Sequence, residues 1–260
     1  MKQTTVISSS ANEHYKFLIS LTTSKGINKQ QQMILSGEKL VNEYLSTNSP
    51  ADLRLQSVVD FDEVRLEKLN KKYDLSNTKK TILSKELFLP LDILGTHNSL
   101  LILQCPPIEE KKINLKLRGV ELVAPLSDPR NLGSLVRTAL GFSVDEIILT
   151  RESANPFLPQ AVKASSGAVL KQKFSYTDLQ LNQILFSKTD YALDLEGKNI
   201  IDVSWPKNFR LILGEEGLGL NLTLEQKKQL NLINIPTANI ESLNATVSAS
   251  IALWEYFKQK

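Results

Sequence analysis

Three short segments of this sequence combine polar side chains with glycines, and each directly follows an apolar run. They span residues 126–139, 211–220 and 235–249. Between them they offer amides, hydroxyls, carboxylates and a guanidinium, which bind and orient a ligand through hydrogen bonds and charge. The two histidines, His14 and His97, lie outside the three segments and are interpreted as surface or loop residues rather than ligands.

The first segment reads Asp-Pro-x-Asn-x-Gly-x-x-x-Arg-x-Ala from residue 128 to residue 139. Its apolar residues fall at helical spacing and predict one buried face, formed by Leu132, Leu135, Val136, Ala139 and Leu140. Asn131 is placed to cap the helix start. Gly133 and Arg137 are four residues apart and are expected to share a face away from the buried one, where glycine would allow close approach of another backbone or of a substrate. The alternative is that Asn131 is only a cap and Arg137 only a solvated charge.

The second segment carries Gly214, Gly217 and Gly219 directly after a buried strand. Glycines at this place let the backbone approach a ligand closely. The spacing G-x-x-G-x-G differs from the dinucleotide fingerprint G-x-G-x-x-G, and no Gly-Lys-Ser/Thr follows. A dinucleotide-dependent oxidoreductase and a phosphate-binding loop are therefore disfavoured, and a plain tight turn is the remaining alternative.

In the third segment a strand ends at Pro236, a polar loop follows, and Ser242 or Asn244 caps a last helix that runs towards Lys258. The expected apolar stripe of this helix consists of Val247, Ile251 and Trp254. Three small residues suit close packing, namely Ala245, Ala249 and Ala252. The alternative is that Ser242 and Asn244 are caps and nothing more.

A sheet must hold these segments together. Beyond residue 114, short apolar runs alternate with helical segments, which predicts an α/β fold with a mostly parallel sheet covered on both faces. The expected strands are residues 120–125, 146–149, 174–176, 191–193, 211–213 and 232–235. Ligands of such sheets bind at the carboxyl ends of the strands, where all three segments begin.

The run Pro106–Lys112 contains two prolines and four consecutive charges, so we expect it to be extended and solvated. We place a linker at residues 106–114, between a domain of residues 1–105 and a domain of residues 115–260. The first is expected to be a small α/β domain with one helix over Lys29–Leu45 and another over Glu63–Lys72. Its expected strands are residues 55–59, 81–83 and 100–103.

Bulk composition excludes some classes of protein and selects none. The 260 residues carry a formal net charge of +3, which permits a nucleic-acid partner without indicating one. No apolar run reaches the length of a membrane span and the N-terminus lacks the apolar core of a signal peptide, so the expected compartment is the cytoplasm. The single cysteine, Cys105, excludes an intrachain disulfide and argues against a thiolate metal site. We expect it to be a small buried residue, and we expect no metal.

Taken in order, the three segments resemble the three motifs of the SpoU (TrmH-like) RNA 2′-O-ribose methyltransferase family, within the SPOUT superfamily. The resemblance covers about residues 117–260 and includes Lys163–Ala168, which looks like the family's segment between its first two motifs. Upstream, Ser9–Asn12 and Leu35–Val41 look more loosely like the ribosomal-protein-like RNA-binding domain that often precedes the catalytic domain in this family.

The resemblance implies a trefoil-knotted domain that uses S-adenosylmethionine to methylate a ribose 2′-hydroxyl of structured ribosomal or transfer RNA. It implies a homodimer through the C-terminal domain, for which the small-residue face of the last helix is suited. By position, the implied catalytic residues are Arg137, Asn131, Ser242, Glu216 and Asn244. The implied donor pocket consists of Leu213, Gly214, Glu216, Gly217, Ile235, Leu243 and Asn244. The sequence departs from the family at four positions that shape this pocket: Ser143, Thr237, Asn239 and Ala245.

Arg137 is the family's candidate for activating the hydroxyl, yet a guanidinium does not deprotonate in proteins. We therefore expect Arg137 to bind the adjacent phosphate and stabilise the developing alkoxide, while phosphate or water accepts the proton. Asn131 and Ser242 would orient the ribose, and Glu216 would hold the loop or Arg137. Two alternatives stay open: methylation of a base nitrogen, and a non-catalytic RNA-binding protein that kept the knot. The residues name neither the RNA nor the nucleotide.

Overall fold

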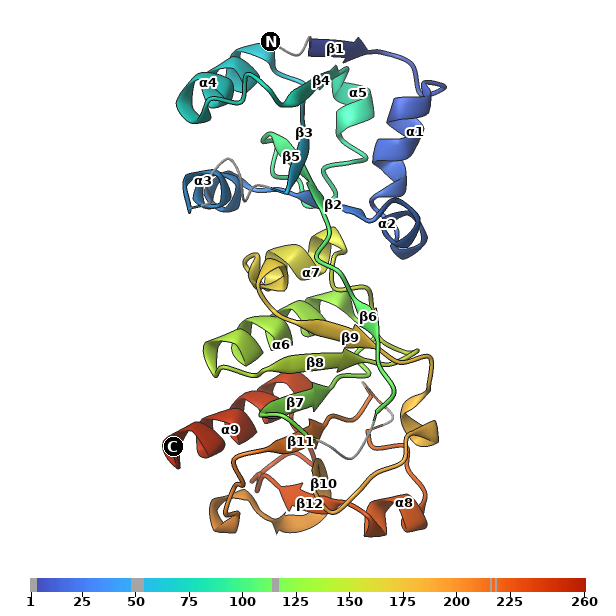
Figure 1. Cartoon of the computed structure of the whole chain (residues 1–260), viewed down its shortest axis with the longest axis vertical. Helices are drawn as coiled ribbons and strands as arrows, with labels where there is room; N and C mark the ends of the chain where they lie inside the picture. Colours follow the sequence, from blue (N-terminus) through green and yellow to red (C-terminus); the bar gives the residue numbers. More distant parts are fainter. Residues whose placement is uncertain (1–3, 48–53, 114–116, 216, 218) are drawn as a thin grey trace. The chain divides into compact units, whose positions relative to one another are not determined.

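The computed structural model describes residues 4–47, 54–113, 117–215, 217 and 219–260 (Figure 1). The chain forms two compact units. The first contains the chain up to Pro106 together with Phe157–Gly167, and the second contains Pro107–Pro156 and Ala168–Lys260.

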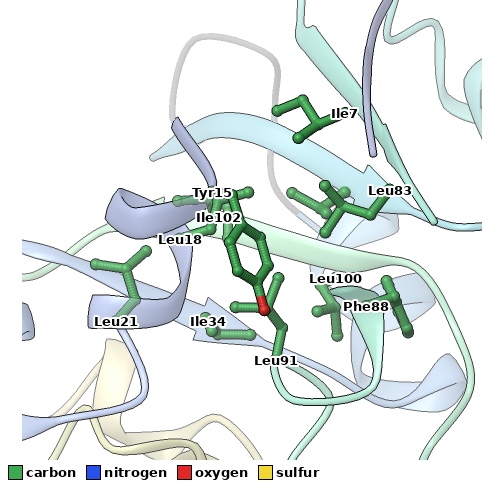
Figure 2. Packing of buried hydrophobic residues seen from close by; sticks show 11 residues of the cluster. Ile7, Tyr15, Leu18, Leu21, Ile34, Leu83, Phe88, Leu91, Leu100 and Ile102 are labelled. Atoms are coloured by element: carbon green, nitrogen blue, oxygen red, sulfur yellow. The ribbon is translucent and has the colours of Figure 1, made fainter. Parts of the chain in front are cut away.

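The first unit is built on a five-stranded sheet in the order β1-β4-β3-β5-β2. The strands β1 (Thr4–Ile7), β4 (Lys79–Leu83) and β3 (Leu55–Asp60) are parallel, and β5 (Leu100–Gln104) runs antiparallel to β3 and to the edge strand β2 (Gln32–Leu35). The helices are α1 (Glu13–Ser20), α2 (Ser24–Gln30), α3 (Glu38–Thr47), α4 (Glu63–Tyr73), α5 (Lys85–Phe88) and α7 (Pro159–Ala164). Figure 2 shows the core, in which Tyr15 and Leu18 of α1 pack with apolar side chains of the strands and Phe88.

The single helix expected over Lys29–Leu45 is wrong. The helix α2 ends at Gln30, the next residue takes a left-handed conformation, and residues 32–35 form β2. Met33, Ile34 and Leu35 are all buried. Three consecutive buried residues suit a strand covered on both faces, whereas a helix buries only one side. Pairing with β5 decided the conformation of this run against its helical spacing.

The second unit contains a seven-stranded sheet in the order β12-β10-β11-β7-β8-β9-β6, and every pair of neighbours is parallel. The predicted α/β fold with a mostly parallel sheet is therefore confirmed. The strands are β6 (Glu109–Glu110), β7 (Val120–Val123), β8 (Glu146–Leu149), β9 (Phe174–Tyr176), β10 (Asp190–Asn199), β11 (Phe209–Ile212) and β12 (Asn231–Asn234). The helices are α6 (Pro129–Gly141), α8 (Leu224–Lys228) and α9 (Ala245–Lys258), with 3-10 turns at Ala168–Leu170, Leu181–Gln183 and Ile200–Asp202.

The run after Pro106 is extended, as expected, and it also joins the second sheet through β6, which pairs with β9. Lys111 follows this strand, and its Nζ donates to Glu121 Oε1 at 2.8 Å and to Glu146 Oε2 at 2.5 Å. The lysine is largely buried there. The expectation of a solvated run holds at Glu109 and Glu110, which are exposed, and is wrong at Lys111, because its ion pairs with two strands of the sheet hold that side chain partly buried.

A buried arginine ties three strands of this sheet together. Arg210 on β11 is 1% exposed, and its guanidinium donates to Glu121 Oε2 on β7 at 2.9 and 3.1 Å and to Asp190 Oδ1 on β10 at 3.2 Å. Burial raises the pKa of Asp190, and Arg210 opposes that effect. A guanidinium stays charged in such a place, so Asp190 depends on Arg210 for compensation, whereas Glu121 is shared between Arg210 and Lys111.

The helices α6 and α9 lie side by side (Figure 1). Thr246 Oγ1 donates to the backbone oxygen of Asn131 at 3.1 Å, and Ser250 Oγ donates to Thr138 Oγ1 at 3.3 Å. The buried face of α9 consists of Thr246, Ala249, Ala252, Leu253 and Tyr256. The expected stripe is wrong, because Val247 and Trp254 are each about half exposed. Apolar residues occur all round this helix, so spacing alone could not select the face that small side chains allow to pack closely.

Within the described residues, no helix is long and apolar enough to cross a membrane.

Candidate functional site

A cavity of about 950 Å³ opens at the carboxyl ends of β11 and β12, beside residues 193–196 of β10 and next to the N-termini of α6 and α9. All three polar segments contribute to its wall. Of the residues assigned to the site from the sequence, those in the lining are Asn131, Leu213, Gly214, Gly217, Ile235, Ser242, Leu243 and Asn244. Segments far apart in the sequence therefore meet at one place, where the sheet rule puts a ligand.

The first segment enters the cavity through the start of α6. Asp128, not Asn131, is the N-cap of this helix: its Oδ1 accepts from the backbone N–H of Arg130 at 2.6 Å, and Pro129 occupies the first turn. A capping residue lies outside the helix, and the proline fixes that boundary three residues earlier than expected. Asn131 thereby lies inside the first turn and lines the cavity.

Arg137 lies six residues further along α6 and is absent from the cavity lining. Its side chain is exposed, whereas Leu132, Leu135, Val136 and Ala139 are buried as expected. Gly133 is buried, so the expectation that it shares an open face with Arg137 is wrong. Leu140, expected in the buried stripe, is 37% exposed. The guanidinium therefore faces solvent and is available to a ligand that lies outside the cavity.

The second segment forms a tight loop after β11. Glu215 and Gly219 exchange two backbone hydrogen bonds of 2.8 and 2.9 Å, and Gly217 and Gly219 have φ of +86° and +63°. A side chain on Gly214 would place its Cβ 2.6 Å from the backbone of Gly219, so only glycine fits. Glu216, assigned to both catalysis and donor binding, lies outside the described residues. Burial, and then the charge of Glu152, raise the pKa of Glu215.

The third segment connects the cavity to α9. Asn244 is the N-cap of this helix, and its Oδ1 accepts from the backbone N–H groups of Thr246 at 2.9 Å and Val247 at 3.4 Å. Its Nδ2 lies 3.5 Å from Asn131 Oδ1. Ile235, Ser242 and Leu243 precede it in the lining. Asn244 thus serves the helix and the cavity at once.

Sequence reasoning missed one wall of the cavity, residues 193–196 of β10. The pairing of β10 with β12 shifts register between Leu193 and Lys198, so the intervening residues leave the ladder. Gly197 permits this excursion, because a Cβ there would lie 2.3 Å from the backbone nitrogen of Ile233. The sequence does carry a signal for this wall, because polar residues directly follow the expected strand at 191–193 and ligands of parallel sheets bind at strand ends.

The excursion carries Asp194, whose Oδ2 lies 2.7 Å from Lys227 Nζ on α8. Its Oδ1 accepts from the backbone N–H of Glu196 at 3.0 Å. Burial alone would raise the pKa of Asp194, but the hydrogen bonds and the charge of Lys227 outweigh burial and lower it. Asp194, Glu196 and Lys227 all line the cavity.

The remaining chemical groups lie elsewhere. Cys105 is buried, and burial raises the pKa of its thiol to about 12, so it is an unreactive core residue as expected. Burial and then the charge of Lys79 lower the pKa of His14, which belongs to the first unit. Among the described residues, no group of three or more His, Cys, Asp or Glu could hold a metal ion.

Comparison with known proteins gives concordant matches. The family model described as the SpoU rRNA Methylase family matches residues 121–254. The 23S rRNA (guanosine(2553)-2'-O)-methyltransferase RlmP of Bacillus subtilis is 29% identical over 262 residues and covers 98% of both chains. The ribosomal RNA small subunit methyltransferase G 2 of Syntrophobacter fumaroxidans is 32% identical over 259 residues, 96% of this chain, and the chain spans only 48% of that relative.

A solved structure shares the fold over nearly the whole length. It is an AdoMet-bound rRNA methyltransferase from Sinorhizobium meliloti, with a TM-score of 0.76, 21% identity and 98% coverage of each chain. Because the family model matches more than half of this chain and includes all three segments, the resemblance read from the motifs is confirmed, and the chain belongs to the SpoU rRNA methylase family.

Proposed function

We propose that this protein transfers a methyl group from S-adenosylmethionine to a ribose 2′-hydroxyl of structured ribosomal or transfer RNA. The observation that carries the proposal is that eight residues assigned from three separate motifs line one cavity at the strand ends of a SpoU family member. The printed activity of the Bacillus subtilis relative, a 2′-O-methyltransferase acting on 23S rRNA, supports the ribose as acceptor.

The cavity has the chemistry that the donor requires. Its volume of about 950 Å³ lies within the range of small-molecule sites. Leu193, Leu213, Ile233, Ile235 and Leu243 supply an apolar wall suited to an adenine ring. Gly214 and Gly217 leave backbone groups open to a ligand. When bound, the donor supplies the activated methyl group, and this chain's residues hold it in place.

The acceptor would lie between the cavity and the exposed face of α6. Asn131, Ser242 and Asn244 present amides and a hydroxyl that can orient a ribose at the cavity. Arg137 lies outside the lining, where it can bind the phosphate next to that ribose and stabilise the developing alkoxide. A guanidinium does not accept a proton, so we assign that role to the phosphate or to water. The role of Glu216 stays a prediction, since it lies outside the described residues.

The strand order is consistent with a trefoil knot, which we include in the proposal. The chain runs from β11 through α8 to β12 at the far edge of the sheet, and α9 then returns to pack on α6. Residues 193–196 within β10 and the loops after β11 and β12 all contribute to the cavity. Knotting through these loops would fix their mutual positions before any ligand binds.

We further propose a homodimer, through a face other than the one expected. Ala249 and Ala252 are fully buried inside the chain against α6, so the small-residue face is not available to a second copy. The exposed face instead presents Phe142, Trp254 and Phe257, whose ring centroids lie 5.7–6.4 Å apart. An aromatic cluster of this kind is typical of an interface core.

We assign RNA docking to the first unit, on the resemblance at Ser9–Asn12 and Leu35–Val41.

The proposal is tested by Arg137→Ala in single-turnover methylation, with donor and RNA saturating. Loss of a charge-stabilising donor lowers turnover by on the order of a hundredfold to a thousandfold, and donor affinity should be unchanged. Arg137→Lys should fail nearly as badly, because an ammonium cannot reproduce the planar fork. The control is Arg151→Ala, an exposed arginine outside the lining.

The product identifies the acceptor. Digestion of the modified RNA to nucleosides should place the methyl group on ribose, whereas a methylated base would favour the base-methylating alternative. Near-normal turnover of Arg137→Ala would show that this residue is only a solvated charge. Absence of any methyl transfer to total RNA by the wild-type chain would favour the non-catalytic alternative.

A further inference from the structure

The described lining of the cavity is strongly acidic. It contains five carboxylates, Asp128, Asp194, Glu196, Glu215 and Glu241, and one ammonium, that of Lys227. The formal charge of this lining is therefore −4. The rest of the protein does not share this bias, since the whole chain carries a formal charge of +3. A cleft lined by one sign of charge focuses its field on whatever it encloses.

The carboxylates come from separate elements and do not converge on one point. They lie at the start of α6, on the excursion of β10, on the loop after β11 and on the loop before α9. No group of metal-ligand geometry exists among the described residues. The single ammonium is already engaged, because Lys227 pairs with Asp194 at 2.7 Å. The carboxylates therefore act on a bound ligand through their combined electrostatic potential and do not coordinate a metal ion.

The proposed reaction changes the charge of the cavity's occupant. The donor carries a sulfonium, an ammonium and a carboxylate, a net charge of +1. Transfer breaks the carbon–sulfur bond of the donor and forms a bond between the methyl carbon and the ribose 2′-oxygen, whose proton passes to the adjacent phosphate or to water. Sulfur keeps the electron pair as a neutral thioether, so S-adenosylhomocysteine is a zwitterion with no net charge.

We propose that the acidic lining distinguishes the cationic donor from the neutral product by charge, so that the cavity binds S-adenosylhomocysteine less tightly than the S-adenosylmethionine from which it forms. The inference rests on the proposed function, since it takes the cavity as the donor pocket. Glu196 and Glu241 are the residues that determine this preference for the donor over the product. Both are exposed at the cavity, so their charge can be removed with little effect on packing.

The expected size follows from Coulomb's law. Two unit charges 4 Å apart in bulk water interact by about 1 kcal/mol, and the interaction falls with distance. Neutralising one exposed carboxylate at the rim should therefore reduce the preference for the donor by about two- to fivefold. Raising the salt concentration to about 0.5 M should reduce the same preference in the wild-type protein, because exposed charges are then screened.

The test is isothermal calorimetry on the full chain with three ligands: S-adenosylmethionine, S-adenosylhomocysteine and sinefungin. Sinefungin replaces the methylsulfonium by a protonated amine, so it carries the donor's charge without a transferable methyl group. The variants are Glu196→Gln, Glu241→Gln and the double substitution, and the control is Glu225→Gln, an exposed carboxylate on α8 outside the lining. Both cationic ligands should lose affinity in the variants, and S-adenosylhomocysteine should be nearly unaffected.

Two results would overturn the inference. One is a ratio of donor to product affinity that stays constant in the double variant. The other is a ratio that does not respond to salt in the wild-type protein, a measurement that needs no variant to fold. Failure of the wild-type chain to bind any of the three ligands would instead refute the donor pocket and, with it, the proposed function.

Discussion

Asn244 performs two tasks that substitution can separate. It caps α9 through its Oδ1 atom, and it presents its Nδ2 amide beside Asn131 at the cavity. A site residue that is also a cap loses activity on substitution for either reason. Serine resolves the ambiguity, because its hydroxyl can accept the capping hydrogen bonds but it has no amide to orient a substrate.

The structure fixes the expected magnitudes. Asn244→Ala removes an acceptor shared by the N–H groups of Thr246 and Val247, and loss of such a cap costs about 1 kcal/mol. For a domain of this size that corresponds to a fall in melting temperature of roughly 2–4 °C. Asn244→Ser should remain within about 0.5 kcal/mol of the wild type. If the amide orients the ribose, both variants should lose methyl transfer by on the order of a hundredfold.

Urea unfolding and single-turnover methylation of both variants form the assay. The decisive result is the serine variant: stable and inactive if the amide acts on the substrate. A stable and fully active Asn244→Ser would show that Asn244 is a cap and nothing more. An alanine variant as stable as the wild type would refute the capping argument itself.

Three further predictions concern stability. Arg210→Met leaves the buried Asp190 without a charged partner and leaves Glu121 with Lys111 alone, so it should cost about 3–5 kcal/mol in urea unfolding. Arg130→Met, at an exposed position, should cost less than about 0.5 kcal/mol. Burial alone would raise the pKa of Glu146, but its lysine partners outweigh burial and lower that pKa. The stabilisation by this carboxylate should therefore be complete above its ordinary pKa of 4.5 and be lost as pH falls through the lowered folded-state pKa. Glu146→Gln should flatten this acid dependence of the melting temperature. Gly197→Ala drives a Cβ into the backbone of β12 and should cost about 1–3 kcal/mol and weaken donor binding, whereas Gly141→Ala meets no neighbour within 4 Å and should be tolerated in both assays.

The sequence determined the features that depend on local pattern. Continuous apolar runs between helical segments identified the strands of the second sheet, because strands buried on both faces need apolar residues at every position. The rule that ligands bind at strand ends then led to the three motifs, and eight of the residues named from them line one cavity. Their order along the chain identified the family, because three motifs together are far more specific than any one of them.

Only the tertiary structure decided what depends on partners distant in sequence. The run at 32–35 became a strand because β5 supplied a ladder for it, although its spacing also fitted a helix. The buried face of α9 was selected by the close approach of α6, since apolar residues surround that helix. The cavity wall formed by Asp194 and Glu196 exists because the register of β10 against β12 shifts between Leu193 and Lys198. The residues of one strand do not determine this register, because it depends on how two strands distant in the sequence pair.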